Sequence, residues 1–322
     1  MKTNSFQIRP LSDSLQSSDG TVILDITATG RYWRTSDITS VSVIRLPAPG
    51  QLNASAMHLT AEKQEDEYEI LTALAAQLDG VREIITFNGN AFDLPHLHAK
   101  YKAYGLADPL TGTEIRDLFS EYRFLAGFLG LPGRHLRDYD DYLLQSVYGG
   151  KIPRSSADAS DAEKTLRILS YDALIALLDG HFSFIRAEKI QDAETVPGDN
   201  IAGRTPGKVL FTLEMADAFA GHISVTDEDC HLAVSGRTAQ LLVRLTDGQL
   251  RYYHADTENY VYLPLEGYAV HRSVGAYVDK KHKEKAVRTN CFHLFTCSDT
   301  FLSDRKQLVN YLSSLLQFLR SR

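Results

Sequence analysis

The stretch TVILDITATG, residues 21–30, opens with an apolar run and ends in a glycine, a pattern typical of a buried strand followed by a turn. Side chains alternate along a strand, so Ile23, Asp25 and Thr27 are expected on one face. A carboxylate near the end of such a strand can belong to a ligand site, or it can satisfy the amide groups of the turn. These residues alone leave both interpretations of Asp25 open.

The elements predicted around this stretch indicate an α/β fold. Further strands are expected at 38–46, 53–60, 82–87 and 113–119, and helices at 64–78, 94–104, 121–129, 136–145 and, as one long helix, 161–178. Three early strands followed by alternating helices and strands predict a mixed central sheet flanked by helices.

A length of 322 residues suggests about two domains. We expect a flexible N-terminal segment over 1–20, an α/β domain over 21–182, a linker over 183–208 and a smaller α+β domain over 209–322. The linker is indicated by turn-forming residues at 193–208, and the last domain by β-rich segments with a hairpin signal at Asp247-Gly248. Helices are predicted there at 270–287 and 304–320.

The composition is that of a globular protein, with 43% hydrophobic and 23% charged residues, and it excludes disordered and fibrous classes. A net charge of −7 does not favour non-specific adhesion to nucleic acid, although a local basic groove is compatible with it. No 18-residue apolar run and no apolar leader occurs, and the three cysteines cannot all pair. We therefore expect a cytoplasmic protein without a membrane span.

Two further aspartates stand where chemistry is possible. Asp93 follows the turn Asn88-Gly89-Asn90, and it can be a ligand or the cap of a helix that continues with Leu94-Pro95. On one continuous helix, Asp172 would lie among apolar neighbours three and four residues away. A carboxylate on that face needs a partner, either an arginine or a bound cation.

Three such carboxylates suit hard divalent cations, which prefer oxygen ligands. Two metal ions about 3.5–4 Å apart can activate water and stabilise the leaving oxygen of a phosphodiester. The order of strand-end, loop and late-helix aspartates is compatible with that arrangement. No glycine-rich nucleotide loop or nucleophile elbow competes with this interpretation.

The chain resembles the YprB-type RNase H-like domain of the DEDD 3′–5′ exonuclease superfamily over about residues 21–180. The segments that carry the resemblance are ILDITATG (23–30), TFNGNAFDLPHL (86–97), IRDLF (115–119), LPGRHLRDYDDYLL (131–144) and LRILSYDALIAL (166–177). FNGNAFDLP is the most specific of these matches.

The resemblance implies an RNase H-like fold and a 3′–5′ exonuclease type of function on a single-stranded DNA or RNA end. It implies that Asp25, Asp93 and Asp172 are catalytic residues that hold Mg²⁺ or Mn²⁺. It further implies substrate-binding roles for Thr27, Asn88 and Phe92, and a supporting role for Asp117.

Two departures from the family pattern bear on catalysis. Thr27 stands where the family has a glutamate ligand, and Ile168 stands where it has a histidine or tyrosine that acts on water. Tyr171, next to Asp172, would point about 100° away on a helix. Rescue by Asp37 is conceivable. Loss of a general base alone can cost about 10²–10⁴-fold.

Two functions follow from the resemblance and its departures. One is a nucleic-acid-processing protein that hydrolyses phosphodiesters with metal if the site is active, with impaired catalysis. The alternative is a non-catalytic module that binds nucleic acid or protein. In the C-terminal part, a basic cluster (Lys280, Lys281, Lys283, Lys285, Arg288) can meet phosphates or be a solvated helix end, and tyrosines at 252, 253, 260 and 262 can stack bases or pack in a sheet.

Overall fold

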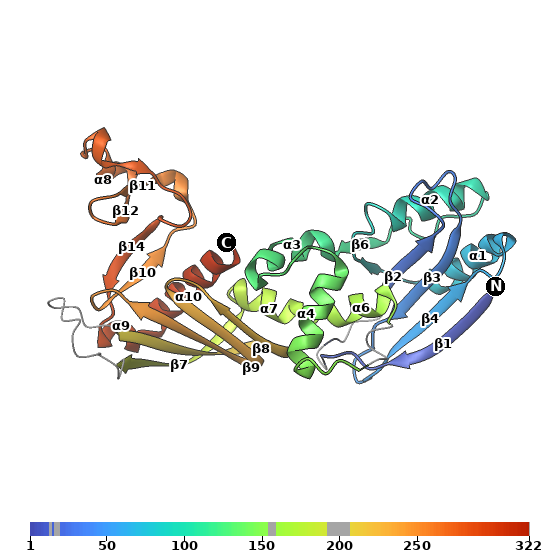
Figure 1. Cartoon of the computed structure of the whole chain (residues 1–322), viewed down its shortest axis with the longest axis horizontal. Coiled ribbons are helices and arrows are strands. Elements are labelled where there is room, and N and C mark those ends of the chain that lie inside the picture. Colours follow the sequence, from blue (N-terminus) through green and yellow to red (C-terminus); the bar gives the residue numbers. More distant parts are fainter. Residues whose placement is uncertain (13–14, 16–19, 154–158, 192–206, 322) are drawn as a thin grey trace. The chain divides into compact units, whose positions relative to one another are not determined.

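The computed structural model describes residues 1–12, 15, 20–153, 159–191 and 207–321. The chain divides into two compact units, Met1–Tyr171 and Asp172–Arg322 (Figure 1). Parts of the predicted N-terminal segment (13–14 and 16–19), of a predicted loop (154–158) and of the predicted linker (192–206) lie outside the described residues.

The first unit is built on a six-stranded mixed sheet with the strand order β1-β4-β3-β2-β5-β6. Its strands are β1 (Lys2–Ile8), β2 (Thr21–Ala28), β3 (Ile38–Arg45), β4 (Ala54–Thr60), β5 (Glu83–Thr86) and β6 (Glu114–Asp117). The strands from β1 to β2 pair antiparallel, whereas β2, β5 and β6 run parallel. The strand TVILDITA is the central strand at which the strand order reverses.

The helices of the first unit fall between and after these strands. They are α1 (Glu67–Leu78, preceded by a short 3₁₀ turn at Gln64–Asp66), α2 (Asp93–Ala103), α3 (Leu118–Leu129), α4 (Leu136–Tyr148) and α6 (Asp161–Ile168). The sheet flanked by helices confirms the predicted α/β fold class.

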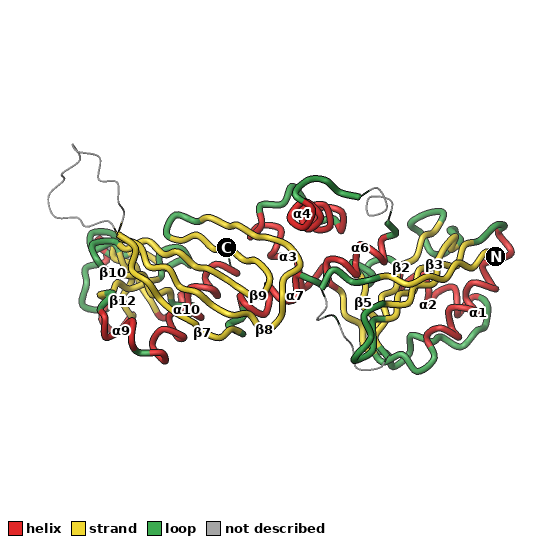
Figure 2. Tube along the Cα trace, turned by 90° about the horizontal axis from the view of Figure 1, so that it is seen from below, coloured by secondary structure: helices red, strands yellow, loops and turns green. Residues whose placement is uncertain are grey.

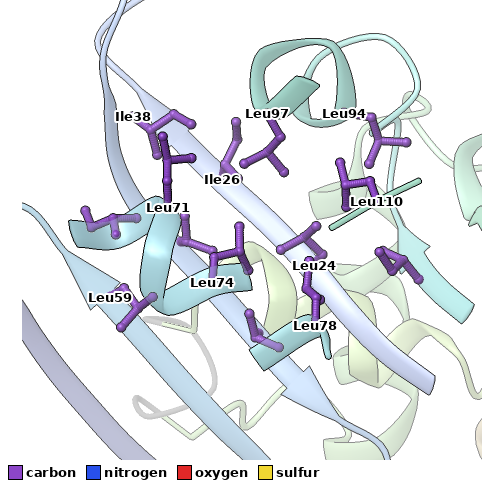
Figure 3. Close-up of a cluster of buried hydrophobic side chains, with 14 of the residues drawn as sticks. Leu24, Ile26, Ile38, Leu59, Leu71, Leu74, Leu78, Leu94, Leu97 and Leu110 are labelled. Atoms are coloured by element: carbon purple, nitrogen blue, oxygen red, sulfur yellow. The ribbon is translucent and has the colours of Figure 1, made fainter. Parts of the chain in front are cut away.

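One face of the sheet carries a hydrophobic core formed with α1 and α2. Val22, Leu24 and Ile26 alternate on this face of β2, and they pack against leucines of α1 and α2 such as Leu74 and Leu97 (Figure 3). Figure 2 shows both helices on the same side of β2 and β3. The residues between them along β2, including Asp25, therefore belong to the opposite face, where α6 contacts β2 and β3.

The N-terminal residues differ from the prediction of a flexible segment, because residues 2–8 form the edge strand β1. This strand pairs with β4 from Lys2↔Thr60 to Ile8↔Ala54, and the ring of Phe6 stacks on His58 at 5.1 Å. Most of its side chains are exposed. Its stability comes from backbone hydrogen bonds to a partner about fifty residues away, which the local polar composition does not reveal.

The single helix predicted over 161–178 is wrong, since the structure has α6 and a separate α7 (Tyr171–Leu178). The last turn of α6 tightens, and the Ser170 amide donates to the carbonyl of Arg167. The Tyr171 hydroxyl donates to the carbonyl of Tyr139 in α4 at 3.0 Å, which fixes the start of α7. Asp172 therefore does not share a continuous helix with Ile168.

The second unit is an α+β arrangement with three small sheets. Its strands are β7 (Phe182–Gln191), β8 (Gly207–Thr226), β9 (Cys230–Leu245), β10 (Gln249–Tyr253), β11 (Tyr260–Leu263), β12 (Tyr268–His271), β13 (Glu284–Lys285) and β14 (Phe292–Thr296), and its helices after α7 are α8 (Arg272–Gly275), α9 (Asp299–Ser303) and α10 (Arg305–Arg320), with 3₁₀ turns at Thr257–Asn259 and Lys280–His282. β7, within the predicted linker, pairs with β8. Among the described residues, no helix is long and apolar enough to cross a membrane.

Two local predictions for this unit have different outcomes. Asp247 and Gly248 both have positive φ angles and form the predicted two-residue turn, after which β10 pairs with β14. The helix predicted over 270–287 is wrong. That segment contains β12, the four-residue α8, a 3₁₀ turn and β13, because β12 and β13 pair on either side of β11.

Candidate functional site

The carboxyl ends of β2, β5 and β6 lie at one edge of the first sheet, because these three strands are parallel. Ligand sites of open α/β sheets form outside this edge, where the strand order reverses. Three segments meet there: the end of β2 with its following loop, the loop between β5 and α2, and the junction of β6 and α3. Most of the aspartates predicted to be functional lie on these segments.

Asp25 lies on β2 opposite Ser42 of β3, on the face that α6 contacts. Its side chain is half-buried. Burial raises the pKa of the Asp25 carboxyl to about 8, and the negative charges of Asp93 and Asp161 raise it further, whereas Lys164 lowers it. The ionised form of this group is therefore costly, and the charge of Lys164 compensates only part of that cost.

Asp93 is the first residue of α2 and is only 5% exposed. Its carboxylate accepts a hydrogen bond from the backbone amide of Ile26, the residue after Asp25, so Asp93 lies next to this part of β2. Burial raises the pKa of Asp93 to about 7, and the charges of Asp117 and Asp161 add to this effect. The helix cap is Phe92, so the alternative that Asp93 caps α2 is wrong.

Asp161, the first residue of α6, lies near enough for its charge to act on both carboxyl groups, and the sequence did not single it out. Its charge raises the pKa of both Asp25 and Asp93, and it forms an ion pair with Lys164 at 2.7 Å. A sequence signal for it exists, since Ser160 and Glu163 form a capping box that fixes the start of α6. That signal places Asp161 in the first turn of the helix.

Three residues stand at the end of the motif: Ile168, Tyr171 and Asp172. Asp172 is half-buried in the first turn of α7, and its role as a metal ligand stays a prediction. Ile168 is completely buried. Tyr171 is also buried, and its hydroxyl is engaged with the carbonyl of Tyr139. Neither side chain offers a base to a bound water.

Asp117 holds the loop between β5 and α2 in place. Its carboxylate accepts hydrogen bonds from the amides of Asn88 at 2.7 Å and Asn90 at 3.2 Å, and it caps α3 through the amide of Phe119. Asn88 adopts the left-handed conformation with φ 64°. These contacts confirm the supporting role expected of Asp117.

The predicted substrate-binding residues surround the aspartates. Thr27 is exposed on the same face of β2 as Asp25. Asn88 lies in the loop that Asp117 holds. Phe92 is half-buried, packs against the core and contacts the ring of His96 at 4.3 Å. Their roles toward a substrate stay a prediction.

The donor set limits which metal site these residues fit. Among the described residues, no three His, Cys, Asp or Glu side chains are positioned to hold a metal ion together. Asp25 and Asp93 alone fit one divalent cation, since Mg²⁺ is commonly held by one or two carboxylates with water and substrate phosphate as the other ligands. They do not fit a two-metal site.

Comparisons with known proteins bear on the same part of the chain. Residues 22–136 match the model of a family described as RNase H superfamily. Among solved structures, the chain is similar to the family B DNA polymerase from the hyperthermophilic archaeon Pyrobaculum calidifontis, with 16% identity and a TM-score of 0.31. That similarity covers 50% of this chain and 25% of the polymerase, so the chain spans a quarter of the polymerase's length. No curated protein matches the chain.

The six-stranded mixed sheet, its flanking helices and the family match together define an RNase H-like α/β fold. This is a nuclease-like fold, as the sequence predicted. The YprB subtype and the degenerate motif stay predictions.

Proposed function

We propose that this protein processes nucleic acid as an RNase H-like module of the 3′–5′ exonuclease type, with one divalent cation held between Asp25 and Asp93. The observation that carries the proposal is the convergence of these two carboxylates at the carboxyl edge of the central strand. Asp93 accepts a hydrogen bond from the backbone amide next to Asp25, and burial makes the ionised form of both groups costly. A phosphate of a single-stranded DNA or RNA end would share that cation.

The chain's own residues determine how far such a site supports catalysis. When bound, Mg²⁺ or Mn²⁺ neutralises charge on the phosphate and makes a coordinated water more acidic. Asp25 and Asp93 would hold the ion, and Lys164 would add positive charge beside them. Thr27 contributes no third carboxylate, and the buried Ile168 cannot accept a proton. We therefore expect phosphodiester hydrolysis to be slow.

The test uses end-labelled single-stranded DNA and RNA with Mn²⁺, and it compares the wild type with Asp25→Asn. We expect slow Mn²⁺-dependent shortening from the 3′ end, reduced at least about tenfold in the variant. Asp141→Asn is the matched control, because Asp141 is an exposed aspartate in a surface ion pair with Arg137. Equal activity of wild type and Asp25→Asn would reject the assigned centre.

A second variant examines the missing ligand. Thr27→Glu places a carboxylate on the exposed position of the Asp25 face, and we expect tighter Mn²⁺ binding and faster cleavage. Thr27→Gln has the same shape without the charge and should bind Mn²⁺ like the wild type. If the glutamate and glutamine variants bind Mn²⁺ equally, the proposed cation position is wrong.

A non-catalytic binding module is the second candidate function. The observation that favours it is the placement of Lys164, whose charge already lowers the pKa of Asp25. Mn²⁺-dependent strand binding without any cleavage in the wild type would support this candidate over the hydrolytic one.

A further inference from the structure

The loop between β2 and β3, residues 29–37, carries aromatic and basic side chains at the same edge of the sheet as Asp25. We call it the aromatic loop. We propose that it is a stacking platform for the bases of a single-stranded nucleic acid whose end lies at Asp25 and Asp93. This inference deepens the proposed function, on which it rests for the position of the strand end.

The aromatic side chains of this loop face solvent. Tyr32 is 79% exposed and Trp33 is 40% exposed, and the guanidinium carbon of Arg34 lies 4.8 Å from the centre of the Trp33 ring. Exposed rings flanked by cations are the elements of sequence-tolerant binding to single strands, because every base has a face that can stack.

The backbone under these rings is held in one conformation. The carbonyl of Tyr32 accepts hydrogen bonds from the amides of Thr35 at 2.9 Å and Ser36 at 3.0 Å, and from the Ser36 hydroxyl at 2.7 Å. Ser36 is buried, and its hydroxyl lies 3.1 Å from Nε2 of His96 in α2. Since α2 begins at Asp93, the loop and the carboxylate site share a rigid support.

The charges of the loop favour a polyanion. Within the part of the chain that the structure describes, neither Arg31 nor Arg34 forms an ion pair with a carboxylate. Asp37 is the acidic residue of the loop, and its carboxylate is occupied by Lys100 at 3.2 Å and Gln64 at 2.7 Å. The loop thus presents positive charge on a chain with a net charge of −7, which points to phosphates rather than to an acidic protein surface at large.

The spacing along β2 allows one strand to reach both places. Residues of a strand rise by about 3.3 Å each, so Gly30 lies at most about 17 Å along the chain from Asp25. A few nucleotides span that distance. The end of the strand would meet the carboxylate site while the preceding bases stack on Tyr32 and Trp33.

The test uses the intrinsic fluorescence of Trp33, the single tryptophan of the chain. The full-length protein is titrated in a metal chelator with oligothymidylate, oligouridylate, an abasic oligomer of the same length and inorganic polyphosphate. We expect quenching by the oligonucleotides, with affinity at least about fivefold weaker for the abasic oligomer and for Tyr32→Ala. Tyr68→Ala, which removes a half-exposed tyrosine of α1, should bind like the wild type.

Several results would overturn the inference. These are equal binding of abasic and normal oligomers, unchanged affinity of Tyr32→Ala, or no response of Trp33 to any strand. A protein partner that binds without competing with any of the oligonucleotides in the titration would also count against the inference. Thermal unfolding of Tyr32→Ala, an exposed substitution, checks that the variant is folded.

Strand binding in the chelator and Mn²⁺-dependent cleavage together separate this inference from the proposed function, because the first tests the aromatic loop and the second tests Asp25. If strand binding does not depend on the aromatic loop while Mn²⁺-dependent cleavage still requires Asp25, only the platform is rejected. If strand binding depends on the loop but cleavage is equal in the wild type and Asp25→Asn, only the proposed metal centre is rejected.

Discussion

At the scale of single residues, Asp25 and Asp93 are carboxylates whose burial makes ionisation costly. Their pKa values, about 8 and about 7, lie above the ordinary value of 3.8. Each group binds a proton more tightly in the folded than in the unfolded protein. Their contribution to stability is therefore complete below the ordinary pKa and is lost as the pH rises through the folded values.

The first prediction is that the metal-free wild type becomes less stable to urea between about pH 5 and about pH 9. Asp25→Asn removes the cost of ionisation and should be more stable than the wild type at the higher pH, on the order of 2 kcal/mol. At the lower pH the two proteins should differ little. A stability of the wild type that rises over this range relative to Asp25→Asn would contradict the buried carboxylate pair.

Gly89 shows a steric requirement at the same scale. A Cβ atom there would lie 2.6 Å from the side chain of Thr86, which is fully buried. We predict that Gly89→Ala lowers the free energy of unfolding by about 1–3 kcal/mol. Gly127→Ala in α3 is the control, because its Cβ would meet nothing within 4 Å, and it should stabilise the protein by about 0.5–1 kcal/mol. Equal effects in urea unfolding would refute the steric argument.

At the scale of elements, α6 carries the charges that connect the carboxylate site to α4. Lys164 lowers the pKa of both Asp25 and Asp140. One turn further on, Arg167 binds the Asp140 carboxylate with two hydrogen bonds of 2.7 and 2.6 Å, and both side chains are largely buried. The buried pair fixes α6 against α4 and thereby positions Asp161.

We predict that Arg167→Ala destabilises the protein by about 3 kcal/mol, because it leaves Asp140 buried without its partner. Arg137→Ala is the matched control, since Arg137 is 81% exposed and pairs with Asp141 at 3.1 Å on the surface of α4. That variant should change stability by less than about 1 kcal/mol. Thermal and urea unfolding measure both, and similar losses for the two arginines would show that burial of the pair is not what matters.

Elements that depend on local signals were predicted well, and those that depend on distant partners were not. Strands β2 and β3 and helix α1 follow from apolar periodicity, and the turn at Asp247-Gly248 follows from its residue types. The edge strand β1 and the strands in place of the helix predicted at 270–287 exist through pairing with β4 and β11. The break between α6 and α7 likewise depends on the hydroxyl of Tyr171 reaching α4.

At the scale of the whole molecule, the acidic net charge sets how nucleic acid can bind. Only a few cations are available at the aromatic loop, and two phosphate contacts from Arg31 and Arg34 would release few counterions. We predict that the logarithm of the binding constant for a single strand falls with the logarithm of salt concentration with a slope of about −1.4. A slope several times steeper, from titrations in a chelator, would place the binding surface elsewhere, for example at the basic residues near Lys280.

The sequence by itself determined the α/β class, the central strand with Asp25 and the loop that Asp117 supports, because alternation, turn residues and apolar periodicity are local properties. It also singled out Asp93, although not the amide of Ile26 to which it binds. Only the tertiary structure decided that the charge of Asp161 acts on these aspartates and that Tyr32 and Trp33 stand exposed. The physical reason is that burial and the proximity of charges arise from packing between elements far apart in the chain. No local sequence pattern indicates which carboxylates will be buried near one another.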